Sequence, residues 1–423
     1  MVFSPHCDDE TLGAGGFINA AVRAGADVRV VMMTNGDGFE VAAAWHYKQI
    51  RITTALLRKF ALARQTETIK ADAALGVPRS HITFLGFPDQ GLAVLWNSNW
   101  SRSKPYFSRF TGCDHNPYED SSHCGQPYCG AAVLSDVEQC LTRFKPDLVL
   151  LPHPNDDHPD HWATSSFVRA AIADLSRRAE ASGNGSRTHA ADWAREMRCQ
   201  FYVVHHGDWP VPQGYHPRVR LAPPFSLAHT DTRWSEFPLT AGEEQAKHLA
   251  VDQYRSQIAV TGRFLMSFVR RTECYGSIAP ARIRVSSSPR PSVMIEESPL
   301  SDTFIRAVEP GGNIRAIRAG QKGDDVSFWV EVRGMVSPRV SYTLRLKNAA
   351  GPVGSSLYAT VRAGRLKTDI PGAAAHAARN EIEVSMPLSQ LANRHDWFVA
   401  ADSRLPYMSI DHAGWREFHV TGS

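Results

Sequence analysis

The turn that follows the first apolar residues constrains this chain more than any other feature. Val2 and Phe3 precede a polar segment, residues 4–13, that holds a His, two adjacent Asp and a Glu before it continues into glycine and alanine. This pattern is typical of the turn between a first strand and a first helix, and open α/β sheets bind their ligands at such turns. The segment therefore predicts an α/β fold with a ligand site at residues 4–13.

The residue types in this turn indicate a metal site. His6 and Asp9 can both reach one divalent ion across the turn, and Asp8 must then point elsewhere, free to face a metal-bound water. A second His-rich loop, residues 158–161, follows another apolar run. Two such loops at one sheet edge would supply a third ligand and an acid.

The two loops resemble a known family. His6-Cys7-Asp8-Asp9-Glu10 is similar to the His-Pro-Asp-Asp-Glu signature of the PIG-L/LmbE-like zinc-dependent de-N-acetylases, and His158-Pro159-Asp160-His161 matches that family's second signature. Both motifs occur in the family's order, each after an expected strand, and the resemblance covers roughly residues 1–275. Cys7 stands where the family usually has Pro, which is not a ligand there, so we expect the change to be tolerated.

The resemblance implies a role for each residue of the two motifs. Zn²⁺, or another divalent metal such as Fe²⁺, would be held by His6, Asp9 and His161. Asp8 would act as general base on a metal-activated water, and His158 would act as general acid toward the leaving amine. Asp160 would orient or polarise His158.

Two further residues are candidates for substrate contact. Arg64 begins a segment similar to the family's Arg-x-x-Glu helix, and Asp89 lies directly beyond an expected strand. Plainer interpretations stay open on sequence alone: Arg64 could form a surface ion pair with Glu67, and Asp89 could belong to an Asp-Gln-Gly turn. Glu10, at the start of the first helix, is interpreted as structural.

The first two thirds of the chain alternate strand and helix patterns. Apolar runs typical of buried strands lie at residues 27–34, 81–86, 147–152 and 199–206. This order predicts a Rossmann-like, doubly wound, mostly parallel sheet. We expect a catalytic domain at residues 1–280, with a long non-periodic insertion at about 87–131.

The residue composition and the hydrophobic pattern change beyond residue 280. Residues 281–303 are rich in Ser and Pro and predict a linker, and residues 304–423 show short alternating runs that predict a sandwich-like all-β accessory domain. No catalytic constellation is visible in this domain. A binding module for a polymer and a packing partner are both open.

The composition argues against nucleic acid as a partner, but it does not decide the cellular compartment of the protein. The net charge is +3 and Lys/Arg runs interleaved with aromatics are absent, so nucleic acid is not predicted. No apolar run approaches the ~20 residues of a membrane span. Only about three residues are left for a first strand that normally has about five or six, which suggests a truncated or misplaced start. The chain as given would be cytoplasmic, and an upstream signal or anchor would make it secreted or a cell-envelope protein.

The sequence leaves open the chemical state of three cysteines in the expected insertion. Cys113, Cys124 and Cys129 lie near His115 and His123. A disulfide, free thiols and a second metal site are the alternatives, and the lack of a Cys-x-x-Cys pair makes a zinc site the least favoured. The sequence also leaves the oligomeric state open.

We therefore predict a zinc-dependent hydrolase that removes an acetyl group from an N-acetylated amino sugar or its conjugate. One alternative is a metal-dependent hydrolase of another amide or ester, because a site fixes chemistry better than substrate. The other is a non-catalytic carbohydrate-binding protein. Asp8 and His158 argue against the latter, because a binding protein needs neither a base nor an acid beside the metal.

Overall fold

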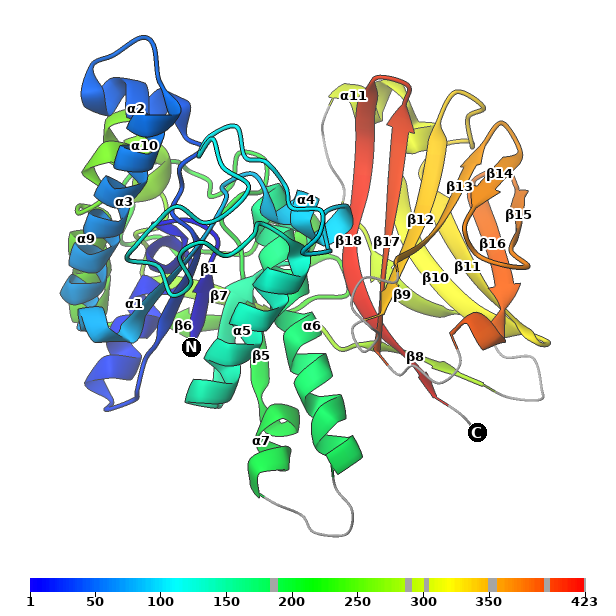
Figure 1. Ribbon diagram of the computed structural model, residues 1–423, viewed down its shortest axis with the longest axis horizontal. Coiled ribbons are helices and arrows are strands. Elements are labelled where there is room, and N and C mark those ends of the chain that lie inside the picture. The colour runs from blue at the N-terminus through cyan, green and yellow to red at the C-terminus, as the bar shows by residue number, and fades with distance from the viewer. Residues whose placement is uncertain (183–188, 286–290, 300–303, 349–355, 392–395, 422–423) are drawn as a thin grey trace. The chain divides into compact units, whose positions relative to one another are not determined.

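The computed structural model describes residues 1–182, 189–285, 291–299, 304–348, 356–391 and 396–421. The chain forms two compact units (Figure 1). The N-terminal unit comprises residues 1–224 and 233–277, and the C-terminal unit comprises residues 225–232 and 278–423. In the described residues, no helix has the length and apolar character needed to cross a membrane.

The N-terminal unit is built on one sheet with the strand order β3-β2-β1-β4-β5-β7-β6. The strands are β1 (Val2–Ser4), β2 (Val30–Thr34), β3 (Ile82–Phe87), β4 (Leu148–Pro152), β5 (Arg198–Tyr202), β6 (Arg233–Pro238) and β7 (Thr272–Ser277). β1 to β5 pair in parallel, whereas β7 and β6 run antiparallel. The predicted mostly parallel sheet is confirmed. Its strand order reverses between β1 and β4, where the carboxyl ends of parallel strands leave a crevice for ligands.

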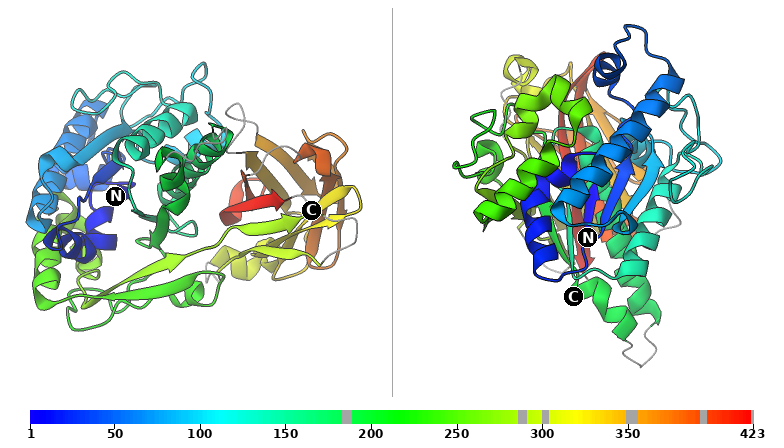
Figure 2. Two further views of the ribbon diagram at one scale, coloured as in Figure 1. Left: turned by 90° about the horizontal axis from the view of Figure 1, so that it is seen from below. Right: turned by 90° about the vertical axis from the view of Figure 1, so that its left-hand side faces the viewer.

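Helices cover both faces of this sheet (Figures 1 and 2). They are α1 (Asp9–Arg23), α2 (Glu40–Tyr47), α3 (Thr54–Leu75), α4 (Leu92–Asn97), α5 (Gly130–Phe144), α6 (Pro159–Ser182), α7 (His189–Glu196), α9 (Ala241–Val251) and α10 (Arg255–Met266). α1, α3 and α9 pack together on one side, and α5 packs on α6 on the other. α3 begins where the Thr53 side chain accepts a hydrogen bond from the Leu56 N–H, and it ends at Gly76, whose positive φ of 92° suits glycine.

A buried ion pair fixes α1 to α9 and β7. Lys247 Nζ donates to Glu273 Oε1 at 2.7 Å and to the Leu12 carbonyl at 2.8 Å, and both charged side chains are 0% exposed. Glu273 also accepts hydrogen bonds from the backbone N–H groups of Gly16 and Phe17, each at 2.8 Å. Because α1 starts at the predicted site, this pair helps to hold the site in place.

We expect Lys247→Met to lower the free energy of unfolding by about 3 kcal/mol, because the buried Glu273 carboxylate loses its cation. Chemical denaturation would measure the loss. The exposed pair of Arg29 with Asp27 is a matched control, and Arg29→Met should change stability by less than about 1 kcal/mol. The double variant Lys247→Met/Glu273→Gln should recover part of the stability. A single variant as stable as the wild type would contradict the role given to the pair.

The C-terminal unit contains, within its described residues, two mostly antiparallel sheets that share one core. One sheet has the order β15-β16-β11-β10-β9 and the other β14-β13-β12-β17-β18-β8. Buried side chains of both, such as Phe328, Trp397 and Phe418, belong to the same hydrophobic cluster. The expected β-rich character of this part of the chain is confirmed.

The elements of the C-terminal unit are short helices and strands. They are α8 (Phe225–Ala228), β8 (Ala281–Arg284), β9 (Val293–Glu297), α11 (Phe304–Val308), β10 (Ile314–Lys322), β11 (Asp325–Val332), β12 (Ser341–Asn348), β13 (Ser356–Arg362), β14 (Arg365–Thr368), β15 (Ala374–Ala377), β16 (Glu381–Pro387), β17 (Asp396–Leu405) and β18 (Met408–Thr421).

The structure differs from the expected linker over residues 281–303. β8 pairs with β18 and β9 pairs with β10, because Ile283 and Ile295 are buried in the shared core. Residues 286–290 and 300–303 of that segment lie outside the described residues. Residues 225–232, expected in the catalytic domain, group with the C-terminal unit, where Asp231 lies 3.1 Å from the buried Arg416.

The expected insertion at 87–131 contains α4 and several loops held by side-chain hydrogen bonds. The Asn116 amide donates to the Leu85 carbonyl at 2.9 Å and to the Ser121 hydroxyl at 2.7 Å. Cys113, Cys124 and Cys129 are free thiols. None of them belongs to a group of potential metal ligands among the described residues. Of the alternatives for these cysteines, the structure has free thiols.

Candidate metal centre and active site

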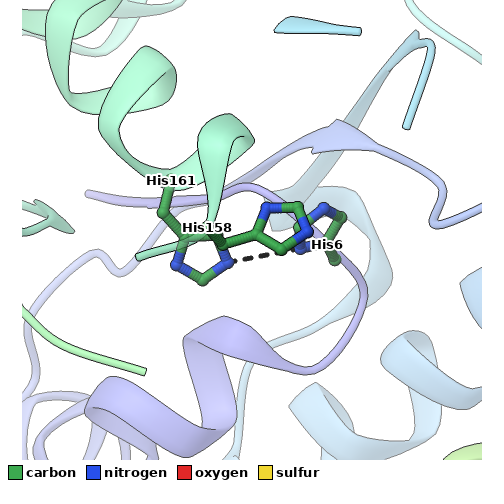
Figure 3. A group of neighbouring side chains, drawn as sticks. All are labelled: His6, His158 and His161. Atoms are coloured by element: carbon green, nitrogen blue, oxygen red, sulfur yellow. Dashed lines mark hydrogen bonds between the residues drawn. The ribbon is translucent and has the colours of Figure 1, made fainter. Parts of the chain in front are cut away.

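The candidate site lies where the carboxyl ends of β1 and β4 are neighbours. The turn after β1 leads directly into α1, which begins at Asp9, and the loop after β4 leads into α6, which begins at Pro159. The two predicted motifs therefore meet at the point where the strand order reverses. Figure 3 shows that His6 from the first loop and His158 and His161 from the second converge.

Three side-chain atoms form a small triangle at this point. His6 Nδ1 and His161 Nε2 each lie 3.0 Å from Asp9 Oδ2, and the two nitrogens are 3.3 Å apart (Figure 3). Two ligands bound at about 2.0–2.1 Å to a tetrahedral zinc ion are themselves about 3.3 Å apart. The triangle thus has the dimensions of three ligand positions around one ion, so these residues fit a divalent metal.

Carboxylates lie behind both imidazoles of the triangle. His161 Nδ1 is 3.2 Å from Asp156 Oδ2. His6 Nε2 is 3.3 Å from Asp89 Oδ1 and 3.3 Å from Asp160 Oδ2. A carboxylate on the second nitrogen fixes the tautomer and orientation of a metal-binding histidine. His6 would therefore bind a metal through Nδ1 and His161 through Nε2.

Other groupings of potential ligands overlap this triangle. They are His6 with His158 and His161, Asp9 with His161 and His205, and His6 with Asp89 and Asp160. In the last group the carboxylates are already used as acceptors. Asp89 accepts from the Gly38 N–H at 2.8 Å, and Asp160 accepts from the N–H groups of Gln90 and Leu92 at 2.6 and 2.9 Å. The triangle is therefore the grouping that best fits a metal ion.

The charges of the triangle suit a cation. Burial alone would raise the pKa of Asp9, but His161 and His6 outweigh it and hold that pKa well below its usual range. Burial would lower the pKa of His6, but Asp89, Asp160 and Asp9 raise it well above its usual range. Asp9 is thus ionised, as a ligand must be, and the proton held by His6 is one that a metal would displace.

Asp8 adopts a rare backbone conformation beside the triangle. Its φ of 152° is uncommon for a residue other than glycine, and such outliers cluster at functional sites. Burial raises the pKa of its carboxyl to about 8, although Arg64 opposes the shift. The carboxyl is therefore largely protonated at pH 7 without a metal, and a cation bound at the triangle would lower this pKa toward the ionised form that a general base requires. The neighbouring Cys7 is a neutral thiol, because burial raises its pKa to about 12.

Arg64 is buried behind Asp8 and is not a surface residue. Its NH1 donates to the Gly36 carbonyl and its NH2 to the Cys7 carbonyl, both at 3.0 Å, and NH2 lies 3.4 Å from Asp8 Oδ2. Glu67 instead accepts hydrogen bonds from the N–H and hydroxyl of Ser256. The alternative of a surface Arg64–Glu67 ion pair is therefore wrong, because α3 turns Arg64 into the site.

His158 and Asp160 are arranged differently from the expectation. The Asp160 backbone N–H donates to His158 Nδ1 at 3.2 Å, whereas the Asp160 carboxylate contacts His6 and the backbone of residues 90–92. Because Nδ1 accepts this hydrogen bond, the single proton of the neutral His158 ring is on Nε2. Burial, together with His6 and His161, lowers the pKa of His158 to about 4, so the ring is neutral at pH 7.

The match to known proteins covers the part of the chain that holds both loops. Residues 1–172 match the family model described as PIG-L: GlcNAc-PI de-N-acetylase. Residues 1–172 form a PIG-L family domain. The predicted membership is confirmed for these residues.

Curated relatives of this PIG-L domain are sugar deacetylases by name. The 1D-myo-inositol 2-acetamido-2-deoxy-alpha-D-glucopyranoside deacetylase of Mycobacterium sp. (strain KMS) is 34% identical over 171 residues, which are 40% of this chain and 47% of the relative. The enzyme of the same name from Corynebacterium kroppenstedtii is 26% identical over 186 residues, 41% of each chain. This chain spans about half the length of the curated relatives it matches. The solved N,N'-diacetylchitobiose deacetylase of Pyrococcus horikoshii has 18% identity, with 65% of this chain and 81% of that chain covered and a TM-score of 0.39.

The predicted site residues line one pocket of about 230 Å³. It is lined by His6, Asp8, Asp9, Leu12, Gly38, Phe39, Arg64, Asp89, Gln90, His158, His205, Gln257, Thr261, Phe264 and Leu265. The metal-side wall comes from the PIG-L domain, whereas the wall that begins at His205 lies beyond residue 172.

Sequence reasoning missed His205 as a residue of this site, whereas it gives Asp156 a structural or supporting role. Asp156 supports His161 from behind, and His205 closes the pocket from the loop after β5. Asp156 stands two positions before His158, which is the signal for its supporting role, whereas His205 carries no signal of its own until the pairing of β5 with β4 is known.

Proposed function

We propose that this chain is a zinc-dependent hydrolase that removes an acetyl group from an N-acetylated amino sugar or its conjugate. The observation that carries the proposal is the triangle of His6 Nδ1, Asp9 Oδ2 and His161 Nε2, with sides of 3.0–3.3 Å, and with Asp8 in the same pocket. The PIG-L domain supports deacetylation, since the named mycobacterial relative is a deacetylase of an acetamido sugar.

His6, Asp9 and His161 would hold the metal. A bound divalent ion lowers the pKa of a coordinated water and polarises an acyl oxygen. Imidazole and carboxylate ligands suit both Zn²⁺ and Fe²⁺, so the donor set favours zinc without excluding iron.

Asp8 takes the proton of the attacking water in this proposal. Its carboxyl lies in the pocket next to Arg64, and a cation held by the triangle would lower its pKa from about 8 so that the ionised carboxylate can take that proton. Asp8 is therefore also able to deliver a proton to the departing amine.

His158 presents Nε2–H as a donor, because its Nδ1 already accepts the Asp160 N–H. In its neutral form it can donate a hydrogen bond to the acyl oxygen as negative charge develops there. To act as the general acid that the sequence predicts, His158 must first gain a second proton, because its pKa is about 4.

Arg64 and Asp89 remain proposed substrate contacts. Both line the pocket, but Asp89 already contacts His6 and Gly38, and two nitrogens of Arg64 bind backbone carbonyls. Among the described residues, Arg64 Nε has no hydrogen-bond partner, and this atom is buried.

Metal removal tests the proposal directly. We expect the purified chain to release acetate from N-acetylglucosamine conjugates, to lose this activity on treatment with a chelator, and to regain it with Zn²⁺ or Fe²⁺. Metal content by mass spectrometry identifies the ion. Acetate release that is unaffected by complete metal removal would overturn the proposed metal role. Full metal occupancy without acetate release from any conjugate would overturn the proposed substrate class.

A further inference from the structure

The pocket wall opposite the metal loops is supplied by residues outside the PIG-L domain. It consists of His205, Gln257, Thr261, Phe264 and Leu265. His205 follows β5, which pairs with β4, and the other four lie on α10. The metal side of the pocket lies within the residues that match the family model, whereas this wall lies beyond them.

His205 is held firmly at the centre of this wall. Its backbone N–H donates to Asp156 Oδ2 at 3.0 Å, and its carbonyl accepts from the Asp157 N–H at 2.8 Å. Its ring stacks on Phe264, with centroids 5.6 Å apart and planes 12° from parallel. The backbone is therefore tied to the second metal loop, and Phe264 fixes the orientation of the ring.

The His205 ring faces the reacting end of the pocket. Its centroid lies 4.8 Å from that of His161 and 5.3 Å from that of His158. In the part of the chain that the structure describes, neither ring nitrogen has a side-chain hydrogen-bond partner. A half-buried imidazole held in this way is prepared to bind a ligand in the pocket.

We propose that His205 is a substrate-contacting residue whose ring nitrogen hydrogen-bonds a hydroxyl or carbonyl oxygen next to the amide that reacts. This inference rests on the proposed function. A neutral imidazole carries one donor and one acceptor nitrogen, which matches a hydroxyl group that can both accept and donate. Thr261 and Gln257 add polar groups beside the apolar faces of Phe264 and Leu265, a mixture that suits a hydroxylated ring. The wall therefore selects the sugar, while the triangle and Asp8 act on the acetamide.

Metal binding by His205 is the rival explanation. His205, Asp9 and His161 offer ligand atoms within 4.8 Å of one another. The triangle with His6 is tighter, at 3.0–3.3 Å, and uses His161 Nε2 and Asp9 Oδ2 already. We therefore assign His205 to the substrate, and metal content decides between the two roles.

Binding to an inactive protein tests the role of His205 without relying on turnover. In the zinc-loaded Asp8→Asn protein, calorimetric titration with N-acetylglucosamine and its methyl glycosides would give Kd. We expect His205→Ala to raise Kd about tenfold, as for loss of one hydrogen bond in a pocket. His205→Gln, which keeps a donor, should recover part of the affinity, and Phe264→Leu should give an intermediate loss. Zinc content should stay unchanged in all of these variants.

His206 is the matched control, since it is the next residue, does not line the pocket and has Nδ1 3.5 Å from Asp157 Oδ1. His206→Ala should leave Kd unchanged. Loss of zinc in His205→Ala would overturn the inference in favour of a metal ligand, and an unchanged Kd would overturn it outright. If the wild type releases no acetate but His205→Ala still weakens sugar binding, the proposed function fails and the inference stands. Absence of binding to every sugar overturns both.

Discussion

Asp8→Asn should reduce acetate release by about 10²- to 10⁴-fold while zinc remains bound. The substitution keeps the size of the side chain but removes the carboxylate that takes up the proton, and a positioned general base contributes a factor of this order. Asp8 is not part of the metal triangle, so zinc content should match that of the wild type. Acetate release under saturating substrate and metal content of the same preparation are the two measurements.

The exposed Asp27 offers a matched control for this substitution. Asp27 pairs with Arg29 at the surface, so Asp27→Asn should leave both activity and zinc content unchanged. If Asp8→Asn kept activity within a factor of ten of the wild type, another group would have to be the base. If it lost zinc as well as activity, Asp8 would be a ligand and the assignment of the triangle would be incomplete.

The sequence was sufficient to predict that the two His- and Asp-rich loops meet at one edge of the sheet. His6 and His161 are far apart in the chain, yet each follows an apolar run at the carboxyl end of a parallel strand, and such ends meet at one edge of the sheet. The mostly parallel sheet could be predicted because strands buried on both faces appear in the sequence as continuous apolar runs. The β-rich end of the chain could be predicted because half-buried strands alternate apolar and polar residues.

Contacts between side chains could not be predicted in the same way. The sequence places Asp160 beside His158, but the first turn of α6 directs its carboxylate to His6 and to the N–H groups of Gln90 and Leu92. Likewise, Arg64 and Glu67 have the spacing of a surface ion pair, and only the packing of α3 shows that Arg64 is buried beside Asp8. The spacing of residues in the sequence determines which of them share one face of a helix or strand, whereas tertiary packing determines which residues that face contacts.

Chain segments with little hydrophobic periodicity could not be predicted from the sequence either. β8 has four residues, too few for an alternating pattern to stand out from the Ser- and Pro-rich sequence that follows it. His205 is a different case, because a single histidine after a strand is no signal until β5 is known to pair with β4. The pocket wall beyond residue 172 is therefore the part of the site that the sequence indicates least.

His161→Ala should abolish zinc binding and with it the proposed hydrolysis. His161 Nε2 supplies one corner of the triangle, and the two remaining corners, on His6 and Asp9, come from one short turn. Structural and catalytic zinc sites use at least three protein ligands, so two should not retain the ion through purification. We expect zinc to fall from about one per chain to near zero, as measured by mass spectrometry of the dialysed protein.

Asp156→Asn separates support of a ligand from ligation itself. Asp156 Oδ2 lies 3.2 Å from His161 Nδ1 and does not belong to the triangle, so its loss should weaken zinc affinity about 10- to 100-fold without abolishing binding. Competition with a chelator of known affinity would measure the change. His115→Ala and Cys113→Ser change residues far from the triangle in the chain, in the Cys- and His-containing loops at 113–129, and should leave zinc at about one per chain. Zinc lost in these two variants but kept in His161→Ala would move the metal away from the strand ends and refute the site assignment.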